Sequence, residues 1–141
     1  MDKENKMIKV VCGIIYKDGK IFIARRKPHK SMGGLWEFPG GKIEEGEEYA
    51  DSLKRELQEE LEMQVEVNDF LMENIHNYDT FSIKLIAFNC EYISAKMKLV
   101  DHDQFKWVSP NKLLSFELAP ADIPIANMIA NNEIRLNSIH Q

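Results

Sequence analysis

Three glutamates, Glu56, Glu59 and Glu60, lie close together in a segment whose apolar residues repeat with the period of a helix. At 100° per residue, these three carboxylates share an arc of about 100° on the helix surface. An apolar stripe runs directly beside this arc and consists of Ala50, Leu53, Leu57 and Leu61. The pattern therefore predicts a helix that buries one edge and directs three carboxylates along the neighbouring edge.

Such an arrangement brings like charges together, because Glu56 and Glu60 are four residues apart on the same face. The repulsion costs a few tenths of a kcal/mol on an exposed helix and more beside a core, where the dielectric is lower. A cation between the acids would offset it, and Mg²⁺ favours carboxylate oxygens and substrate phosphates. The alternative is a solvated, glutamate-rich face, since residues 44–62 contain nine acids and two bases. Arg55 is predicted to pair with Glu59 at i,i+4 in either case.

The elements around this helix are predicted mostly as strands. Residues 7–16 and 21–24 are apolar and β-branched, and the Asp-Gly step between them indicates a hairpin. A loop at 27–35 and a short extended piece at 36–38 follow, ended by a Pro-Gly-Gly turn at 39–41. The acidic helix is predicted from about residue 47 to residue 61.

The second half continues with predicted strands at 65–78 and 81–93, turning near residues 79–80, and a short strand at 105–108. Ser109 and Pro110 are typical of a helix N-cap and first helical position, and a final helix is predicted from about Pro124. This order predicts an α/β protein with helices packed on a mixed sheet.

Composition limits the classes of function. The 141 residues are 44% hydrophobic with a net charge of −5, which suits one domain spanning residues 1–141. Two cysteines, no signal-peptide pattern and no apolar segment of membrane-spanning length predict a cytoplasmic protein without a membrane partner. An acidic chain without a basic stripe also argues against nucleic-acid binding.

The spacing of the acidic segment resembles the signature of the Nudix hydrolases. Gly41 is followed by Glu47 and then by the run from Arg55 to Glu60, in the family's order and spacing. The main departure is Glu62, where the family pattern has glycine. The segments IFIARR, LWEFPGGKIEEGE and WVSP…LAPADIP are similar to the MutT-like branch, so the resemblance covers residues 8 to about 128. It implies an α/β/α sandwich with a mixed β-sheet.

The resemblance implies an activity and a set of roles. Members of this branch hydrolyse nucleoside triphosphates by attack on the β-phosphorus, giving nucleoside monophosphate and pyrophosphate, in some cases to clean the nucleotide pool. Glu47 and Arg55 resemble the pair that shapes the loop and orients the helix. The implied ligands of Mg²⁺ or Mn²⁺ are the backbone carbonyl of Gly40 and the carboxylates of Glu56, Glu59 and Glu60.

A further acid is expected from a distant loop. Counting six residues back from Trp107 leads to Asp101, where relatives commonly have glutamate. Asp101 is one methylene shorter, so it would reach the metal directly or through water, or it is an ordinary loop aspartate. The general base is either Glu56 or Asp101, and the cleaner motif match favours Glu56.

Three side chains are candidates for contact with the nucleotide. Arg26 resembles a nucleotide-contacting position, with a solvated strand end as the alternative. Phe38 would line a base pocket or belong to the core. Tyr78 lies where relatives place an aromatic residue against the base, and the alternative is a plain sheet aromatic.

Asp122 is the candidate for reading the base. Members specific for 8-oxo-guanine have asparagine there, whereas an ionised aspartate only accepts hydrogen bonds and suits the amine of cytosine. An N-cap role on the last helix is the alternative, and both roles are compatible. Phe81 also stands where guanine-specific members carry arginine. These differences favour a cytidine-type or broad base preference over 8-oxo-dGTP diphosphatase activity.

Other functions are compatible with the same family. A Nudix hydrolase of another nucleoside diphosphate derivative is the alternative among enzymes, and a nucleotide-sensing Nudix domain is the alternative that lacks activity. The presence of all three metal-site glutamates argues against the sensor. A monomer and a homodimer are both compatible with the sequence.

Overall fold

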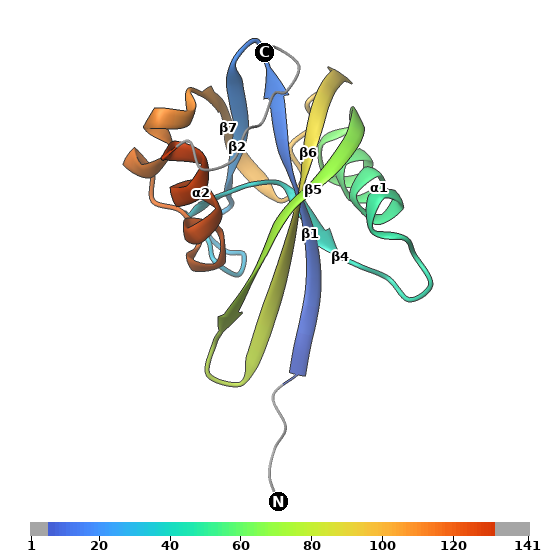
Figure 1. Cartoon of the computed structure of the whole chain (residues 1–141), viewed down its shortest axis with the longest axis vertical. Coiled ribbons are helices and arrows are strands. Elements are labelled where there is room, and N and C mark those ends of the chain that lie inside the picture. The colour runs from blue at the N-terminus through green and yellow to red at the C-terminus, as the bar shows by residue number, and fades with distance from the viewer. Residues whose placement is uncertain (1–5, 132–141) are drawn as a thin grey trace, which may run out of the picture.

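The computed structural model describes residues 6–131, which are built around a seven-stranded mixed sheet (Figure 1). The path of the sheet is β3-β2-β1-β6-β5, while β4 pairs with β1 and β7 pairs with β2. The strands are β1 (Lys6–Lys17), β2 (Lys20–Arg26), β3 (Trp36–Glu37), β4 (Gly40–Lys42), β5 (Met63–Asn77), β6 (Phe81–Ala95) and β7 (His102–Val108). Only β1 and β6 run parallel among the registered pairs of these described strands.

Helices cover the two faces of this sheet (Figure 1). They are α1 (Tyr49–Leu61) on one side and, on the other, α2 (Ile123–Ala130) with the 3₁₀ helices η1 (Pro110–Ser115) and η2 (Pro120–Asp122). This arrangement confirms the predicted α/β/α sandwich. No helix within the described part of the chain is long and apolar enough to cross a membrane.

Alternate residues of β1 and β2 pack into two different hydrophobic cores, one on each face of the sheet. Val11 and Ile15 pack into the cluster that contains the leucines of α1, whereas Cys12 and Ile14 pack into the cluster that contains α2. Successive strand residues point to opposite faces, so one apolar strand supplies both cores. Leu53, Leu57 and Leu61 are fully buried, which confirms the apolar stripe predicted for α1.

Several boundaries differ from the sequence prediction. The helix α1 begins at Tyr49, so Glu47 lies in the preceding loop and not in the helix. β7 begins at His102, three residues before the predicted start, because it pairs with β2 as far as Arg26. Tyr78 lies just beyond β5.

Glu62 ends α1 at the position where the family pattern has glycine, and its backbone is strained. Glu62 has φ 50° and ψ 48°, the left-handed conformation that usually selects glycine. Its backbone N–H donates to Gln58 and Leu57, and its carboxylate lies 3.9 Å from the ammonium groups of Lys96 and Lys98. The helix therefore ends where the family's glycine would end it, and Glu62 does not extend it.

The predicted Pro-Gly-Gly turn is wrong, because Gly40 and Gly41 belong to the strand β4. Gly41 pairs with Val11 of β1, and Gly40 pairs with Cys12. Neither glycine has a positive φ. A Cβ at Gly40 would collide with the carbonyl oxygen of Val11, so glycine is needed here for close approach of two backbones.

Ser109 and Asp122 do precede helices, as predicted, but their side chains do not cap them. Ser109 precedes Pro110 at the start of η1, and Asp122 precedes α2, yet neither side chain makes a capping hydrogen bond. The oxygen atoms of Asp122 are used elsewhere, as described below.

We expect Gly40→Ala to lower the free energy of unfolding by about 1–3 kcal/mol, because the added Cβ would meet fixed backbone atoms of Val11 and Cys12. Gly41→Ala is the matched control, since its Cβ would meet the end of the flexible Glu56 side chain. Urea denaturation of both variants measures the difference. Equal losses of stability would contradict the close-approach explanation.

Candidate active site

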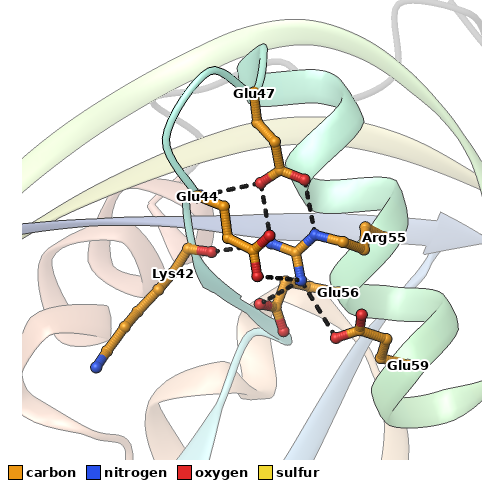
Figure 2. A network of polar contacts seen from close by, with 6 residues as sticks. All are labelled: Lys42, Glu44, Glu47, Arg55, Glu56 and Glu59. Carbon is orange, nitrogen blue, oxygen red and sulfur yellow. Dashed lines mark hydrogen bonds and ion pairs between the residues drawn. The ribbon is translucent and has the colours of Figure 1, made fainter.

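The guanidinium of Arg55 joins the loop before α1 to the helix itself (Figure 2). Its Nε and Nη2 donate to the two carboxylate oxygens of Glu47 at 2.7 and 2.9 Å, and Nη2 also donates to the carbonyl of Lys42 at 3.2 Å. Nη1 donates to Glu56 at 3.1 Å and to Glu59 at 3.2 Å. Arg55 therefore holds the loop and orients two of the candidate ligands, and its predicted pairing with Glu59 is confirmed.

The same network determines the charge of its members. Hydrogen bonds from Arg55 are the main cause that lowers the pKa of Glu47 to about 2. Glu47 in turn raises the pKa of Arg55 above its ordinary value. Glu47 also accepts a hydrogen bond from the backbone N–H of Glu44, at 2.9 Å, which closes the loop. The fork of a guanidinium on a carboxylate is a strong, directional pair.

The three helix glutamates differ in burial. The side chains of Glu56 and Glu60 are 13% and 18% exposed, whereas that of Glu59 is 60% exposed. Glu56 and Glu60 thus border the core as the sequence predicts, and Glu59 lies on the outer side of the arc. Burial raises the pKa of Glu56. A Cβ at Gly41 would fall on the Glu56 carboxylate, so the glycine leaves the space that this carboxylate fills.

Glu60 and Asp101 meet in the structure, although 41 residues separate them in the sequence. Burial, followed by the hydrogen bond with Asp101, raises the pKa of Glu60 to about 9. The same hydrogen bond lowers the pKa of Asp101, and Lys30 adds to this effect with its ammonium 2.9 Å from Asp101 Oδ1. The two opposite shifts favour the form in which Glu60 donates to the Asp101 carboxylate.

The carboxylates at α1 and Asp101 are the groups available to hold a divalent cation. Within residues 6–131, no three His, Cys, Asp or Glu side chains are gathered around one position that would hold a metal ion. Arg55 instead engages Glu56 and Glu59, and a proton lies between Glu60 and Asp101. The carboxylates of Glu56, Glu59, Glu60 and Asp101 are hard oxygen donors. A cation bound among them would replace the proton that Glu60 and Asp101 share. The residues present therefore fit Mg²⁺ or Mn²⁺ by their chemistry.

Two residues that the sequence analysis missed connect these acids to the rest of the site. Glu37 of β3 lies 2.8 Å from Nε2 of His102, and its carboxylate also lies 3.4 Å from Arg26 Nη1. The other ring nitrogen of His102, Nδ1, is 4.0 Å from Glu60 Oε1. No pattern in the sequence marks Glu37 and His102 as partners, because only the pairing of β2 with both β3 and β7 brings them together.

A pocket of about 140 Å³ lies beside the carboxylates and contains the four side chains predicted to contact the nucleotide. Its walls come from β1, β2, β3, β4 and β6, from the turn between β5 and β6, and from η2. Its lining includes Arg26, Phe38, Tyr78 and Asp122, together with Glu37, Gly40 and Gly41. Because Gly41 both lines this pocket and contacts Glu56, the pocket and the carboxylate helix share a wall.

Asp122 is the buried acid of this pocket. It is 6% exposed, and its Oδ2 accepts a hydrogen bond from the backbone N–H of Phe38 at 2.9 Å. Burial, reinforced by the charge of Glu37, raises the pKa of Asp122 well above its ordinary value. The carboxyl group thus fixes the chain after β3 instead of capping α2.

The other pocket side chains have structural contacts of their own. Arg26 Nε donates to the carbonyl of Ser31 at 2.8 Å, so the guanidinium is not a solvated strand end. Phe38 is buried and belongs to the core cluster as well as to the pocket wall. Tyr78 stacks on Phe81, with ring centroids 5.0 Å apart, which explains how Phe81 supports the pocket without entering its lining.

The comparisons with known proteins agree with this geometry. A protein-family profile described as "NUDIX domain" matches residues 10–128. The chain is 38% identical over 120 residues to the CTP pyrophosphohydrolase of Escherichia coli (strain K12), which covers 85% of this chain and 89% of the relative. It is 40% identical over 89 residues to the 8-oxo-dGTP diphosphatase of Proteus vulgaris, covering 62% and 78% of the two chains.

Solved structures show the same likeness. The solution structure of the E. coli ORF135 protein is similar with a TM-score of 0.78 and 35% identity, over 92% of each chain. The crystal structure of the MutT protein from Methanosarcina mazei Go1 is similar with a TM-score of 0.80 and 26% identity, over 94% of this chain and 98% of the other.

The raised pKa of Glu60 predicts how stability depends on pH in the presence of EDTA. The folded protein retains this proton up to a pH of about 9, whereas the unfolded chain loses it near 4.5. The contribution of Glu60 to stability is therefore full below pH 4.5 and is lost as the pH rises toward 9. We expect the Tm of Glu60→Gln to fall less than that of the wild type across this range. Parallel pH profiles of Tm would show that Glu60 titrates normally.

Proposed function

This chain belongs to the Nudix hydrolases, in the MutT-like branch of nucleotide pyrophosphohydrolases, and we propose that it hydrolyses nucleoside triphosphates to nucleoside monophosphate and pyrophosphate with Mg²⁺ or Mn²⁺. The observation that carries the proposal is the shared wall at Gly41, which contacts Glu56 and lines the pocket containing Asp122. A base in this pocket would have its phosphates directed at the carboxylates of α1.

The groups that would hold the ion are the carbonyl of Gly40 and the carboxylates of Glu56, Glu59 and Glu60, with Asp101 adjacent to Glu60. When bound, a divalent cation neutralises phosphate charge and makes water a stronger nucleophile. Arg55 keeps the carboxylates of Glu56 and Glu59 oriented and, through Glu47, keeps the loop after β4 in place. Asp101 is held beside Glu60 by Lys30.

Glu56 is the general base in this proposal. It accepts a proton from the attacking water, whose oxygen bonds to the β-phosphorus while the bond to the bridging oxygen of the α-phosphate breaks and nucleoside monophosphate leaves. A carboxylate with a raised pKa is a better proton acceptor, and burial raises the pKa of Glu56. The pKa of Asp101 is lowered, which makes it the weaker candidate.

The base preference is proposed to be cytidine-type or broad. An ionised Asp122 presents acceptors only and suits the exocyclic amine of cytosine, and one relative is named a CTP pyrophosphohydrolase. The raised pKa of Asp122 also favours a protonated form, which both donates and accepts as an amide does. That property supports 8-oxo-dGTP as the second candidate substrate, in line with the relatives named 8-oxo-dGTP diphosphatase.

We expect hydrolysis to require Mg²⁺ or Mn²⁺ and to stop in excess EDTA. Glu56→Gln and Glu60→Gln each replace a carboxylate by an amide of the same shape, so kcat should fall by about 100-fold or more while both variants stay folded. Release of pyrophosphate measures the rate, and Glu66→Gln on the exposed part of β5 is the control. Full turnover in excess EDTA would overturn the proposed function.

A panel of CTP, dCTP, 5-methyl-dCTP and 8-oxo-dGTP tests the base preference through kcat/KM. The cytidine nucleotides are expected to be hydrolysed at least as well as 8-oxo-dGTP. Asp122→Asn, which can still accept from Phe38 N–H, should shift the ratio toward 8-oxo-dGTP by about tenfold or more. A wild-type preference for 8-oxo-dGTP by orders of magnitude would refute the cytidine assignment.

A further inference from the structure

Met32 adopts a backbone conformation that is costly for any residue with a side chain. Within residues 6–131, four residues other than glycine have a positive φ: Asp18 at 51°, Met32 at 59°, Glu62 at 50° and Met97 at 57°. The left-handed region brings the Cβ too close to the backbone, so such a residue persists only where other interactions compensate for the strain. The reason for each of the four is therefore informative.

Three of these residues have a structural reason for their conformation. Asp18 and Gly19 form the two-residue turn between β1 and β2, which requires a positive φ at both positions. Glu62 ends α1 and donates its backbone N–H to carbonyls of the last turn. The side chain of Met97 packs against the core cluster that contains the leucines of α1. A turn, a helix end and a core contact thus explain these three.

Met32 has no such role. It lies half-buried in the loop between β2 and β3 and belongs to neither of the two hydrophobic clusters among the described residues. That loop instead adds Met32 to the lining of the pocket that contains Asp122. Strained backbone that packing does not explain commonly marks a binding or catalytic site. The place of Met32 in the pocket is therefore the reason that remains.

The loop around Met32 is fixed on both sides. Arg26 Nε donates to the carbonyl of Ser31 at 2.8 Å. The carbonyl of Met32 accepts from the backbone N–H of Leu35 at 3.2 Å. Gly33 lies so close to the carbonyl oxygens of the preceding turn that a Cβ would collide with them. These contacts hold the left-handed backbone in place, so the Met32 side chain lines the pocket before any ligand binds.

The chemistry of a thioether suits one part of a nucleotide in particular. The charged side chains of the pocket are Arg26, Glu37 and Asp122, and its other side chains are apolar or aromatic. Sulfur contacts aromatic rings favourably, and the unbranched side chain of methionine adapts to ligands of different shape. Met32 therefore matches the flat face of a base, whereas the charged groups suit its hydrogen-bonding edge or the phosphates.

We propose that Met32 contacts the face of the base in the bound nucleotide, and that its left-handed backbone places the side chain there at a cost in stability. This inference rests on the proposed function and adds a binding residue distinct from the acid proposed to read the edge of the base. An adaptable side chain on the face of the base also accounts for a broad base preference, because it packs against a pyrimidine or a purine.

Three substitutions separate the contact from the strain. Met32→Ala removes the side chain beyond Cβ and keeps the strain, Met32→Gly removes both, and Met32→Leu keeps an apolar side chain of similar volume. Met97→Ala is the matched control, since this methionine has nearly the same φ but packs in the core. For each variant we would measure Tm, and kcat and KM with CTP and with 8-oxo-dGTP.

Met32→Ala and Met32→Gly are expected to raise KM by about tenfold with kcat nearly unchanged, because the lost contact is made equally in the ground state and the transition state. Met32→Leu should keep KM within about threefold of the wild type. Met32→Gly should have a higher Tm than Met32→Ala, because glycine adopts the left-handed region without strain. Met97→Ala should lower the Tm and leave KM unchanged.

A spectroscopic test reports the contact without turnover. In protein labelled with carbon-13 at the methionine methyl groups, saturating CMP or 8-oxo-dGMP should shift the Met32 resonance, because the ring current of the base acts on it. The Met97 resonance should not move. The Met32 resonance is identified by its loss in Met32→Leu.

Either an unmoved Met32 resonance in nucleotide-saturated protein or an unchanged KM in Met32→Ala would overturn the contact. Equal Tm values for Met32→Gly and Met32→Ala would contradict the strain. A wild type that hydrolyses no nucleoside triphosphate would refute the proposed function, whereas the Met32 resonance tests the contact with nucleotide independently.

Discussion

Strand β4 passes close to β1 at Gly40 and close to the Glu56 side chain of α1 at Gly41. A Cβ at Gly40 would enter the backbone of β1, and one at Gly41 would enter the carboxylate of Glu56. This close approach places the helix carboxylates against the sheet and makes Gly41 a common wall of the carboxylate site and the pocket. The proposed metal site and base pocket therefore depend on two residues that have no Cβ, Gly40 and Gly41.

Charge is the second constraint, and the protein meets it with fixed partners. Arg55 binds four carboxylates on the loop and the helix, while Lys30 compensates Asp101 on the opposite side. The proton between Glu60 and Asp101 is the remaining compensation. Because the acids are partly withdrawn from water, each of these partners has more influence on pKa than it would on an open surface.

The pocket and the carboxylates are connected by side chains as well as by backbone. Glu37 faces the pocket, His102 lies behind it, and Glu60 stands beyond His102. Asp122 fixes the backbone at Phe38, directly after Glu37, so the acid proposed to read the base also supports this connection. The residues between the pocket and the carboxylates of α1 are therefore only two or three side chains apart.

The sequence by itself determined the layers, the strand order of the main hairpins, the amphipathic helix and the spacing of its glutamates, because these follow from periodicity and local turns. It also indicated Asp101 and the four pocket residues, through resemblance to a family. It misplaced Gly40 and Gly41 in a turn, because it held no sign of the neighbouring backbone that forces them to be glycine. Glu37, His102 and Lys30 were missed for the same reason: their partners lie far away in the chain. Only the pairing of β2 with β3 and β7, and the packing of α1 on the sheet, decided which acids are buried, which are paired and which keep a proton.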